Sequence, residues 1–132
     1  MEIEPFVGVG VIRFGDTRQQ VRDALQRPFE SFRKVVGANE TDAFDELGLH
    51  VYYDGQDRVE AIEGFGSASL TIGGLVLLGR SIDDVDKELS ALGHSSHPTD
   101  VGLQYDSAGI ALTAPSGVVE GVGVYVRGYY SA

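Results

Sequence analysis

An internal repeat constrains the fold of this chain more than any other feature. Glycine, hydroxyl and apolar residues occur in residues 10–25 in an order that recurs in residues 74–89. Two further stretches recur in the same order, and the spacing drifts by only a few residues, as loop insertions would make it do. The repeat predicts two units of the same architecture, residues 1–66 and 67–132. The matched segments are 10–25 with 74–89, 44–51 with 105–112, and 59–62 with 119–122.

Each unit is expected to open with an apolar strand that ends at a glycine and leads into a short helix. Thr17 and Ser81 stand where the two helices begin, and a hydroxyl there accepts a hydrogen bond from a free backbone N–H group. Gln20 completes a capping box with Thr17, and the residues after Ser81 form a looser version of it. Pro28 and Gly93 mark the helix ends, because proline lacks an N–H and glycine favours the C-terminal turn.

The rest of each unit has the pattern of antiparallel strands. Asp54-Gly55 lies between two strand-like runs and is a strong hairpin signal. Each unit is therefore expected to be β-α-β-β-β, and the two should share one core, because a unit of about 60 residues buries too little surface alone. The chain is thus predicted to be an α+β protein with helices packed on one face of an antiparallel sheet. The strands expected after the helices are 31–36, 49–53 and 59–62, then 102–105, 110–113 and 118–126.

Composition excludes several classes of function. The 132 residues are 42% hydrophobic and include no cysteine, so the chain should fold without disulfides or sulfur-ligated metals. A formal net charge of −10 repels the phosphates of nucleic acids and attracts a basic partner, although it also serves simply to keep a protein soluble. No segment approaches the roughly 18 apolar residues of a membrane span, and the first residues lack a signal-peptide pattern. A cytoplasmic protein without membrane contact is expected.

Residues that carry chemistry are sparse. His94 and His97 lie in one loop with Asp100 as the nearest third ligand or catalytic partner, and an exposed loop is the more ordinary interpretation. The glycines at residues 8–10, followed by Gly15, lack the lysine of a P-loop and the spacing of a dinucleotide fingerprint. We therefore predict no catalytic residue, no metal and no cofactor.

The sheet face that the helices leave open is the predicted binding surface. Side chains alternate along a strand, so His50 and Tyr52 are expected on this face, and so are Tyr125, Arg127 and Tyr129. Tyrosine and arginine are typical of the residues that dominate protein interfaces. The alternative is that these tyrosines pack on each other or against the sheet of the other unit.

Two segments carry a resemblance to known proteins. Residues 12–28 and 49–62 resemble the opening and the closing hairpin of the helix-on-sheet modules of the beta-lactamase-inhibitor-protein and outer-membrane lipoprotein (SmpA/OmlA) type. The tandem arrangement resembles the inhibitor proteins, in which two such units form a concave sheet surface that grips the target. The build is also similar to that of small acidic immunity proteins, which neutralise bacterial toxins. The resemblance implies a protein-binding sheet face and carries over no individual residue.

The leading hypothesis is a non-enzymatic cytoplasmic protein-binding module, an immunity-type inhibitor of a basic protein partner. The alternative is a small-ligand-binding protein or an enzyme that uses the cleft between the two units, with His94, His97 and Asp100 or other carboxylates at its rim. A third hypothesis is a structural module that dimerises through its sheet. The sequence leaves the oligomeric state open.

Overall fold

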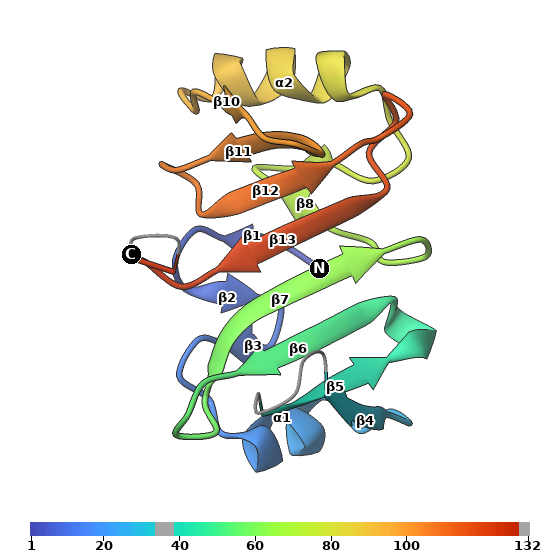
Figure 1. Cartoon of the computed structure of the whole chain (residues 1–132), viewed down its shortest axis with the longest axis vertical. Coiled ribbons are helices and arrows are strands. Elements are labelled where there is room, and N and C mark those ends of the chain that lie inside the picture. The colour runs from blue at the N-terminus through green and yellow to red at the C-terminus, as the bar shows by residue number, and fades with distance from the viewer. Residues whose placement is uncertain (34–38, 130–132) are drawn as a thin grey trace.

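A computed structural model describes residues 1–33 and 39–129 and shows a mixed α+β protein (Figure 1). Within these residues, eight strands form one sheet in the order β10-β11-β12-β13-β7-β6-β5-β4, and each neighbouring pair is antiparallel. Antiparallel pairing suits the short connections between successive strands. The strands are β4 (Glu30–Arg33), β5 (Glu40–Phe44), β6 (Leu49–Tyr53), β7 (Val59–Phe65), β10 (His97–Pro98), β11 (Gly102–Tyr105), β12 (Ile110–Thr113) and β13 (Gly121–Tyr125).

The apolar segments expected as opening strands form short hairpins that do not join the eight-stranded sheet. Glycine causes the early reversal of the chain: Gly10 has a φ of 56° and Gly73 a φ of 55°, which glycine adopts without strain. In Figure 1 most of these short strands lie behind the large sheet. They are β1 (Ile3–Glu4), β2 (Gly8–Val9) and β3 (Ile12–Arg13) in one small sheet, and β8 (Thr71–Ile72) and β9 (Leu75–Val76) in another.

Two helices lie at opposite ends of the large sheet, α1 beside β4 and β5 and α2 beside β10 and β11 (Figure 1). The predicted capping box of α1 is confirmed, because the Thr17 hydroxyl accepts from the Gln20 N–H at 3.2 Å and Gln20 Oε1 accepts from the Thr17 N–H at 2.8 Å. The looser version at α2 is wrong, since the Ser81 side chain makes no capping hydrogen bond. The helices are α1 (Arg18–Leu25) and α2 (Ile82–Ala91).

Four strands of the large sheet follow each helix, one more than predicted. The sequence did not indicate β5, because Asp42 interrupts its apolar pattern although this carboxylate is fully buried. It did not indicate β10 either, a two-residue strand that contains Pro98. The strand expected at 31–36 is present as β4, and residues 34–36 lie outside the described residues. The strand expected at 118–126 is present as the shorter β13.

One continuous core joins the helices, the short hairpins and one face of the large sheet. Val21 of α1 and Leu89 of α2 belong to it, together with a row of residues that pair across the central strands, Val51, Ile62 and Val124. Burial of each such side chain contributes about 1.5–3 kcal/mol to folding. Neither helix among the described residues has the length and apolar character needed to cross a membrane.

The other face of the large sheet faces the viewer in Figure 1, where no described helix or hairpin passes in front of β6, β7 and β13. Burial alternates accordingly along β6: Leu49, Val51 and Tyr53 are buried in the core, whereas His50 and Tyr52 are only half-buried. This period of two is the expected pattern for a strand with one covered face. We call the side that carries His50 and Tyr52 the open face.

Candidate functional site

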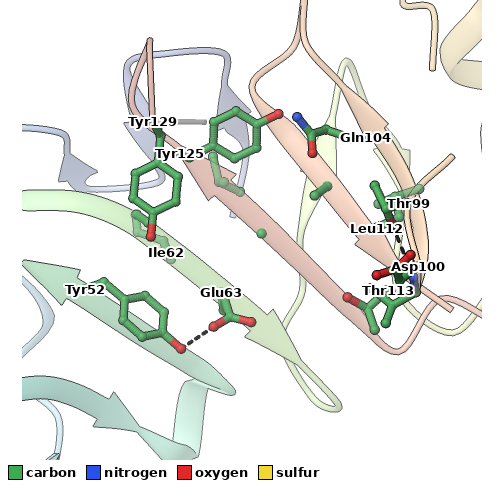
Figure 2. A pocket seen from close by; sticks show the side chains of 15 residues that line it. Tyr52, Ile62, Glu63, Thr99, Asp100, Gln104, Leu112, Thr113, Tyr125 and Tyr129 are labelled. Atoms are coloured by element: carbon green, nitrogen blue, oxygen red, sulfur yellow. Dashed lines mark hydrogen bonds between the residues drawn. The ribbon is translucent and has the colours of Figure 1, made fainter. Parts of the chain in front are cut away.

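The open face is hollowed over the central strands of the sheet. The hollow has a volume of about 460 Å³ and lies where β7 pairs with β13 (Figure 2). Its lining comes from five strands of the sheet, from the loop between β10 and β11, and from the turn after β13. The lining residues are Tyr52, Ala61, Ile62, Glu63, Thr99, Asp100, Val101, Gln104, Ala111, Leu112, Thr113, Gly123, Val124, Tyr125 and Tyr129.

Small residues on adjacent strands form the floor of the hollow. Gly123 on β13 lies opposite Ala111 on β12 and opposite Glu63 on β7. Of the described atoms, only the carbonyl oxygen of Ala111 comes within 4 Å of a Cβ built on Gly123, at 3.9 Å. Gly123 is not among the residues with positive φ, so neither its backbone nor close packing requires a glycine. The missing side chain instead leaves room above the sheet.

Tyr52 and Glu63 form one wall of the hollow. Tyr52 lies opposite Ala61 and Glu63 lies opposite His50, so the two side chains are diagonal neighbours on β6 and β7. The Tyr52 hydroxyl donates a hydrogen bond to Glu63 Oε1, drawn as a dashed line in Figure 2. Burial, this hydrogen bond and the charge of Glu63 all raise the pKa of Tyr52 well above its ordinary value. The phenol therefore remains a neutral donor to the carboxylate.

We expect Tyr52 to stay protonated while exposed tyrosines ionise near pH 10. Substituting Tyr52→Phe should leave the tyrosinate absorbance gained between about pH 9 and 11 unchanged, because burial and Glu63 disfavour the phenolate. A spectrophotometric titration of both proteins checks this, with circular dichroism to confirm that each stays folded. If the variant gained less absorbance than wild type, by the contribution of one tyrosine, Tyr52 would ionise in this range and the expectation would be wrong.

Tyr125 and Tyr129 form a second aromatic wall. Their ring centroids lie 6.0 Å apart with an interplanar angle of 25°, a stacked arrangement. Tyr125 is only 5% exposed, and its hydroxyl donates to the Ile110 carbonyl at 3.3 Å. Tyr129 is 41% exposed, and in Figure 2 its ring reaches toward Tyr52. A ring that is supported on one side and exposed on the other is suited to contact with a partner.

The far rim of the hollow is the loop before β11. The Thr99 hydroxyl accepts from the N–H groups of Val101 at 3.3 Å and Gly102 at 3.0 Å, so the turn that carries Asp100 is tightly held. Figure 2 shows Asp100 on the side of the hollow opposite Tyr52. Among the described lining residues, Glu63 and Asp100 are the charged ones, and no arginine, lysine or histidine is present. The hollow therefore has a negative lining that disfavours anions.

The structure brings together three of the five residues predicted for the partner surface. Tyr52, Tyr125 and Tyr129 line the hollow. His50 shares their face but packs between aromatic rings, with centroids 5.3 Å from Phe32 and 4.7 Å from Phe65. Arg127 places its guanidinium 3.9 Å from the centre of the Phe6 ring. It lines a neighbouring hollow of about 470 Å³, which shares Gln104, Tyr125 and Tyr129 with the first.

The three residues considered for a metal or for acid–base chemistry do not converge. His94 Nδ1 lies 2.9 Å from the Ser107 hydroxyl, whereas His97 Nε2 lies 3.2 Å from the carboxylate of Asp106. Hydrogen bonds from Gln104 and His97 lower the pKa of Asp106. Asp100 lines the hollow, whereas neither His94 nor His97 is among its lining residues. Within residues 1–33 and 39–129, no three His, Cys, Asp or Glu side chains are grouped closely enough to hold a metal ion.

A buried ionic cluster beneath the first helix was not predicted from the sequence. Asp42 is fully buried and accepts hydrogen bonds from Arg18, Arg22, Ser31 and Tyr53, at 2.8 to 3.1 Å. Burial alone would raise the pKa of Asp42, but the hydrogen bonds from Arg22 and Ser31 and the charge of Arg22 hold it below its usual value. Arg18 and Arg22 are four residues apart on one helix face, where like charges repel each other unless an acid lies opposite. Their spacing is therefore the sequence signal that could have indicated the cluster. The cluster fixes α1 to β5 and lies in the covered side of the sheet.

Comparison of this chain with models of protein families, with curated proteins and with solved structures finds no match. Tyrosine rings attract cations through their electron-rich faces, and carboxylates accept hydrogen bonds from cationic donors. An open hollow of this composition is chemically suited to basic or aromatic groups.

Proposed function

We propose that this chain is a non-enzymatic cytoplasmic protein-binding module, of the immunity-type inhibitor class, which receives a basic protein partner on its open face. The observation that carries the proposal is the tyrosine-lined, acidic hollow at the centre of that face. Such a hollow offers aromatic anchors surrounded by polar groups, which is the usual composition of an interface centre. The net charge of −10 adds attraction for a basic partner over a longer range.

The proposed tandem organisation would account for the position of the hollow in the middle of the sheet. In the proposed arrangement residues 1–66 supply β4 to β7, residues 67–132 supply β10 to β13, and β7 joins β13 edge to edge. The pair Glu63 and Gly123 at this join is separated by 60 positions, the same spacing as in the sequence match of 59–62 with 119–122. A two-fold axis that relates the two units would therefore pass through this pair. The helices of both units would then cover the same face of the sheet, opposite the hollow.

The fused sheet is large enough for a protein partner. Eight strands spaced by 4.7–4.9 Å extend over about 34 Å, comparable to the width of a typical interface that buries about 800 Å² on each partner. Fusion of two units also removes one exposed strand edge from each, which limits unwanted edge-to-edge association. The resemblance to tandem helix-on-sheet inhibitors supports the same use of the sheet face.

Filling the hollow is expected to abolish capture of the partner. Gly123→Leu places a side chain in the hollow where the described residues leave room, so the fold should persist while the partner loses its docking space. Gly55→Leu is the matched control, because Gly55 lies exposed in the β6–β7 turn with no described atom within 4 Å of a built Cβ and without positive φ. Wild-type and variant proteins are immobilised, exposed to lysate of the source cells, and the retained proteins are identified by mass spectrometry.

The proposal requires one basic protein that wild type and Gly55→Leu retain and that Gly123→Leu and Tyr129→Ala lose. Affinity for that purified protein should fall as the salt concentration rises from about 0.05 to 0.5 M, because charge attraction is screened. Equal retention by Gly123→Leu, or no protein retained by wild type, would refute the proposed surface.

A small-ligand-binding protein is the second candidate, and the size of the hollow favours it. A volume of about 460 Å³ falls within the range of 300–1,000 Å³ typical of ligand pockets. The hollow also lies at the join of the two proposed units, where a cleft was expected. A ligand of this kind would be released on denaturation of the purified wild type and Gly55→Leu proteins and would be absent from Gly123→Leu.

A further inference from the structure

We propose that the hollow above Gly123 receives the guanidinium group of an arginine side chain from the protein partner, between the tyrosine rings and the carboxylates of Glu63 and Asp100. The inference rests on the proposed function and adds the chemistry of the group that is recognised. It goes beyond a general preference for basic partners, because it names one side chain and the residues that select it.

The position of the carboxylates favours a cation at the centre of the hollow. Glu63 comes from β7 and Asp100 from the loop between β10 and β11, so the two acids stand on different sides of the floor (Figure 2). No basic side chain is among the described residues that line the hollow. A cation that enters is therefore attracted from two directions, and an anion is repelled.

The chain already binds one of its own arginines with the same set of groups. The guanidinium of Arg18 lies 4.0 Å from the centre of the Tyr53 ring. The same guanidinium donates to Asp42 Oδ1 at 3.0 Å and to Asp57 Oδ1 at 2.8 Å. The Tyr53 hydroxyl in turn donates to Asp42 Oδ2 at 3.1 Å. A tyrosine bonded to a carboxylate thus forms an arginine site on the covered side of β6.

Tyr52 and Glu63 reproduce this arrangement on the open face. The Tyr52 hydroxyl donates to the Glu63 carboxylate, as that of Tyr53 does to Asp42. Tyr52 and Tyr53 are consecutive on β6, so one pair faces the core and the other faces the hollow. The open-face pair has the neighbouring ring of Tyr129 and the floor at Gly123 within the same hollow, which leaves room for a side chain from outside.

Arginine fits these groups better than lysine. Its planar guanidinium stacks on an aromatic ring while its edge donates hydrogen bonds to a carboxylate, whereas an ammonium is a compact and strongly hydrated charge. Among the described residues, Arg22 and Arg127 also lie over aromatic rings, at 4.2 Å from the centre of Phe29 and 3.9 Å from that of Phe6. The small side chains of Ala61 and Ala111 in the floor admit the apolar stem.

A titration followed by amide NMR of the isotope-labelled chain tests the inference. The probes are Nα-acetyl-arginine methylamide and the corresponding citrulline compound, which has nearly the same shape without the charge. The arginine probe should shift the amide signals of Gly123, Ala111 and Glu63 with a dissociation constant on the order of 1 mM, as expected for so small a ligand. The citrulline probe should bind at least about tenfold more weakly, since it lacks charge-assisted hydrogen bonds.

Variants locate the site and separate it from general attraction to an acidic surface. Glu63→Gln and Asp100→Asn should each weaken binding of the arginine probe, and Glu63→Gln should raise its dissociation constant by about tenfold. Asp100 lies in an exposed loop, so Asp100→Asn should leave the fold intact. Gly123→Leu should abolish the shifts, while Gly55→Leu should keep them. Asp23→Asn, at an exposed position of α1 that does not line the hollow, should have no effect.

Equal binding of both probes, shifts centred on α2, or shifts that persist in Gly123→Leu would overturn the inference. The proposed function fails in the capture experiment and not in this titration: it fails if no protein is captured through the open face. A captured partner that is lost in Gly123→Leu, together with a chain that does not distinguish arginine from citrulline, would refute only the arginine assignment.

Discussion

Replacing Asp42 with alanine is expected to lower the free energy of unfolding by about 3–5 kcal/mol, the usual result of removing one partner from a buried ion pair. Asp42 is 0% exposed and accepts five hydrogen bonds from α1, β4 and β6. Its loss leaves Arg22 and the Tyr53 hydroxyl without their buried acceptor. Urea denaturation of wild type and variant, followed by circular dichroism, measures the difference.

Ser31→Ala is the matched control, because it leaves Asp42 and both arginines in place. It removes the hydrogen bond that Ser31 donates to Asp42 and the longer one that its hydroxyl accepts from Arg22. We expect it to cost about 1–2 kcal/mol, the net contribution of one or two hydrogen bonds. If Asp42→Ala costs no more than Ser31→Ala, the cluster contributes little to stability.

The same cluster makes stability depend on pH in a defined direction. The pKa of Asp42 is lower in the folded chain than its ordinary value of 3.8. The stabilisation from the carboxylate is therefore fully present above that ordinary value and is lost as the pH falls through the lower pKa of the folded state. The difference in free energy of unfolding between wild type and Asp42→Asn should shrink in acid and stay constant above about pH 5.

Gly102→Ala is expected to lower the free energy of unfolding by about 3 kcal/mol, at the upper end of the cost of overpacking. A Cβ built on Gly102 would lie 1.9 Å from the carbonyl oxygen of Leu112 and 2.9 Å from its carbonyl carbon. Both are backbone atoms of the neighbouring strand β12, so no side-chain rotation relieves the contact. β11 must shift, and the loop with Asp100 that precedes it must shift as well. Thermal unfolding and urea denaturation measure the loss.

Gly123→Ala is the comparison within the same sheet. The only described atom near its built Cβ is the Ala111 carbonyl oxygen at 3.9 Å, so we expect a gain of about 0.5 kcal/mol from reduced freedom of the unfolded chain. Similar effects of the two substitutions would show that backbone packing does not distinguish the two glycines. A loss confined to Gly102 would support the use of Gly123→Leu as a probe of the hollow.

Local structure follows from residues that are close in the chain. Thr17 and Gln20 form the capping box that their spacing predicts, and Asp54-Gly55 turns the chain between β6 and β7. The alternation within β6 places Tyr52 on the open face, as predicted. Each of these features depends on contacts over a few residues, which a sequence pattern records directly.

The missed features depend on partners that are distant in the sequence. β5 was not predicted, because an aspartate such as Asp42 is normally a surface residue. In the structure Asp42 is paired with Arg18 and Arg22, which lie on a helix 20 or more positions earlier in the sequence. His50 and Arg127, which stay predictions for the partner surface, also contact aromatic rings from other segments, and the strand pattern did not indicate these contacts. Sequence alternation specifies a face of a strand and leaves open which neighbours share it.

The repeat, the two helices and the orientation of Tyr52 and Tyr125 on their strands are properties of the sequence, because they arise from periodicity and short-range hydrogen bonding. Tyr129 lies in the turn after β13, so strand alternation does not set its orientation. The hollow is a product of the tertiary structure. It exists because β7 pairs with β13 in the register that puts Gly123 opposite Glu63, and because the loop before β11 brings Asp100 to the rim. Strand register is selected by burial of a whole face across the sheet, so no local pattern specifies which residues meet there.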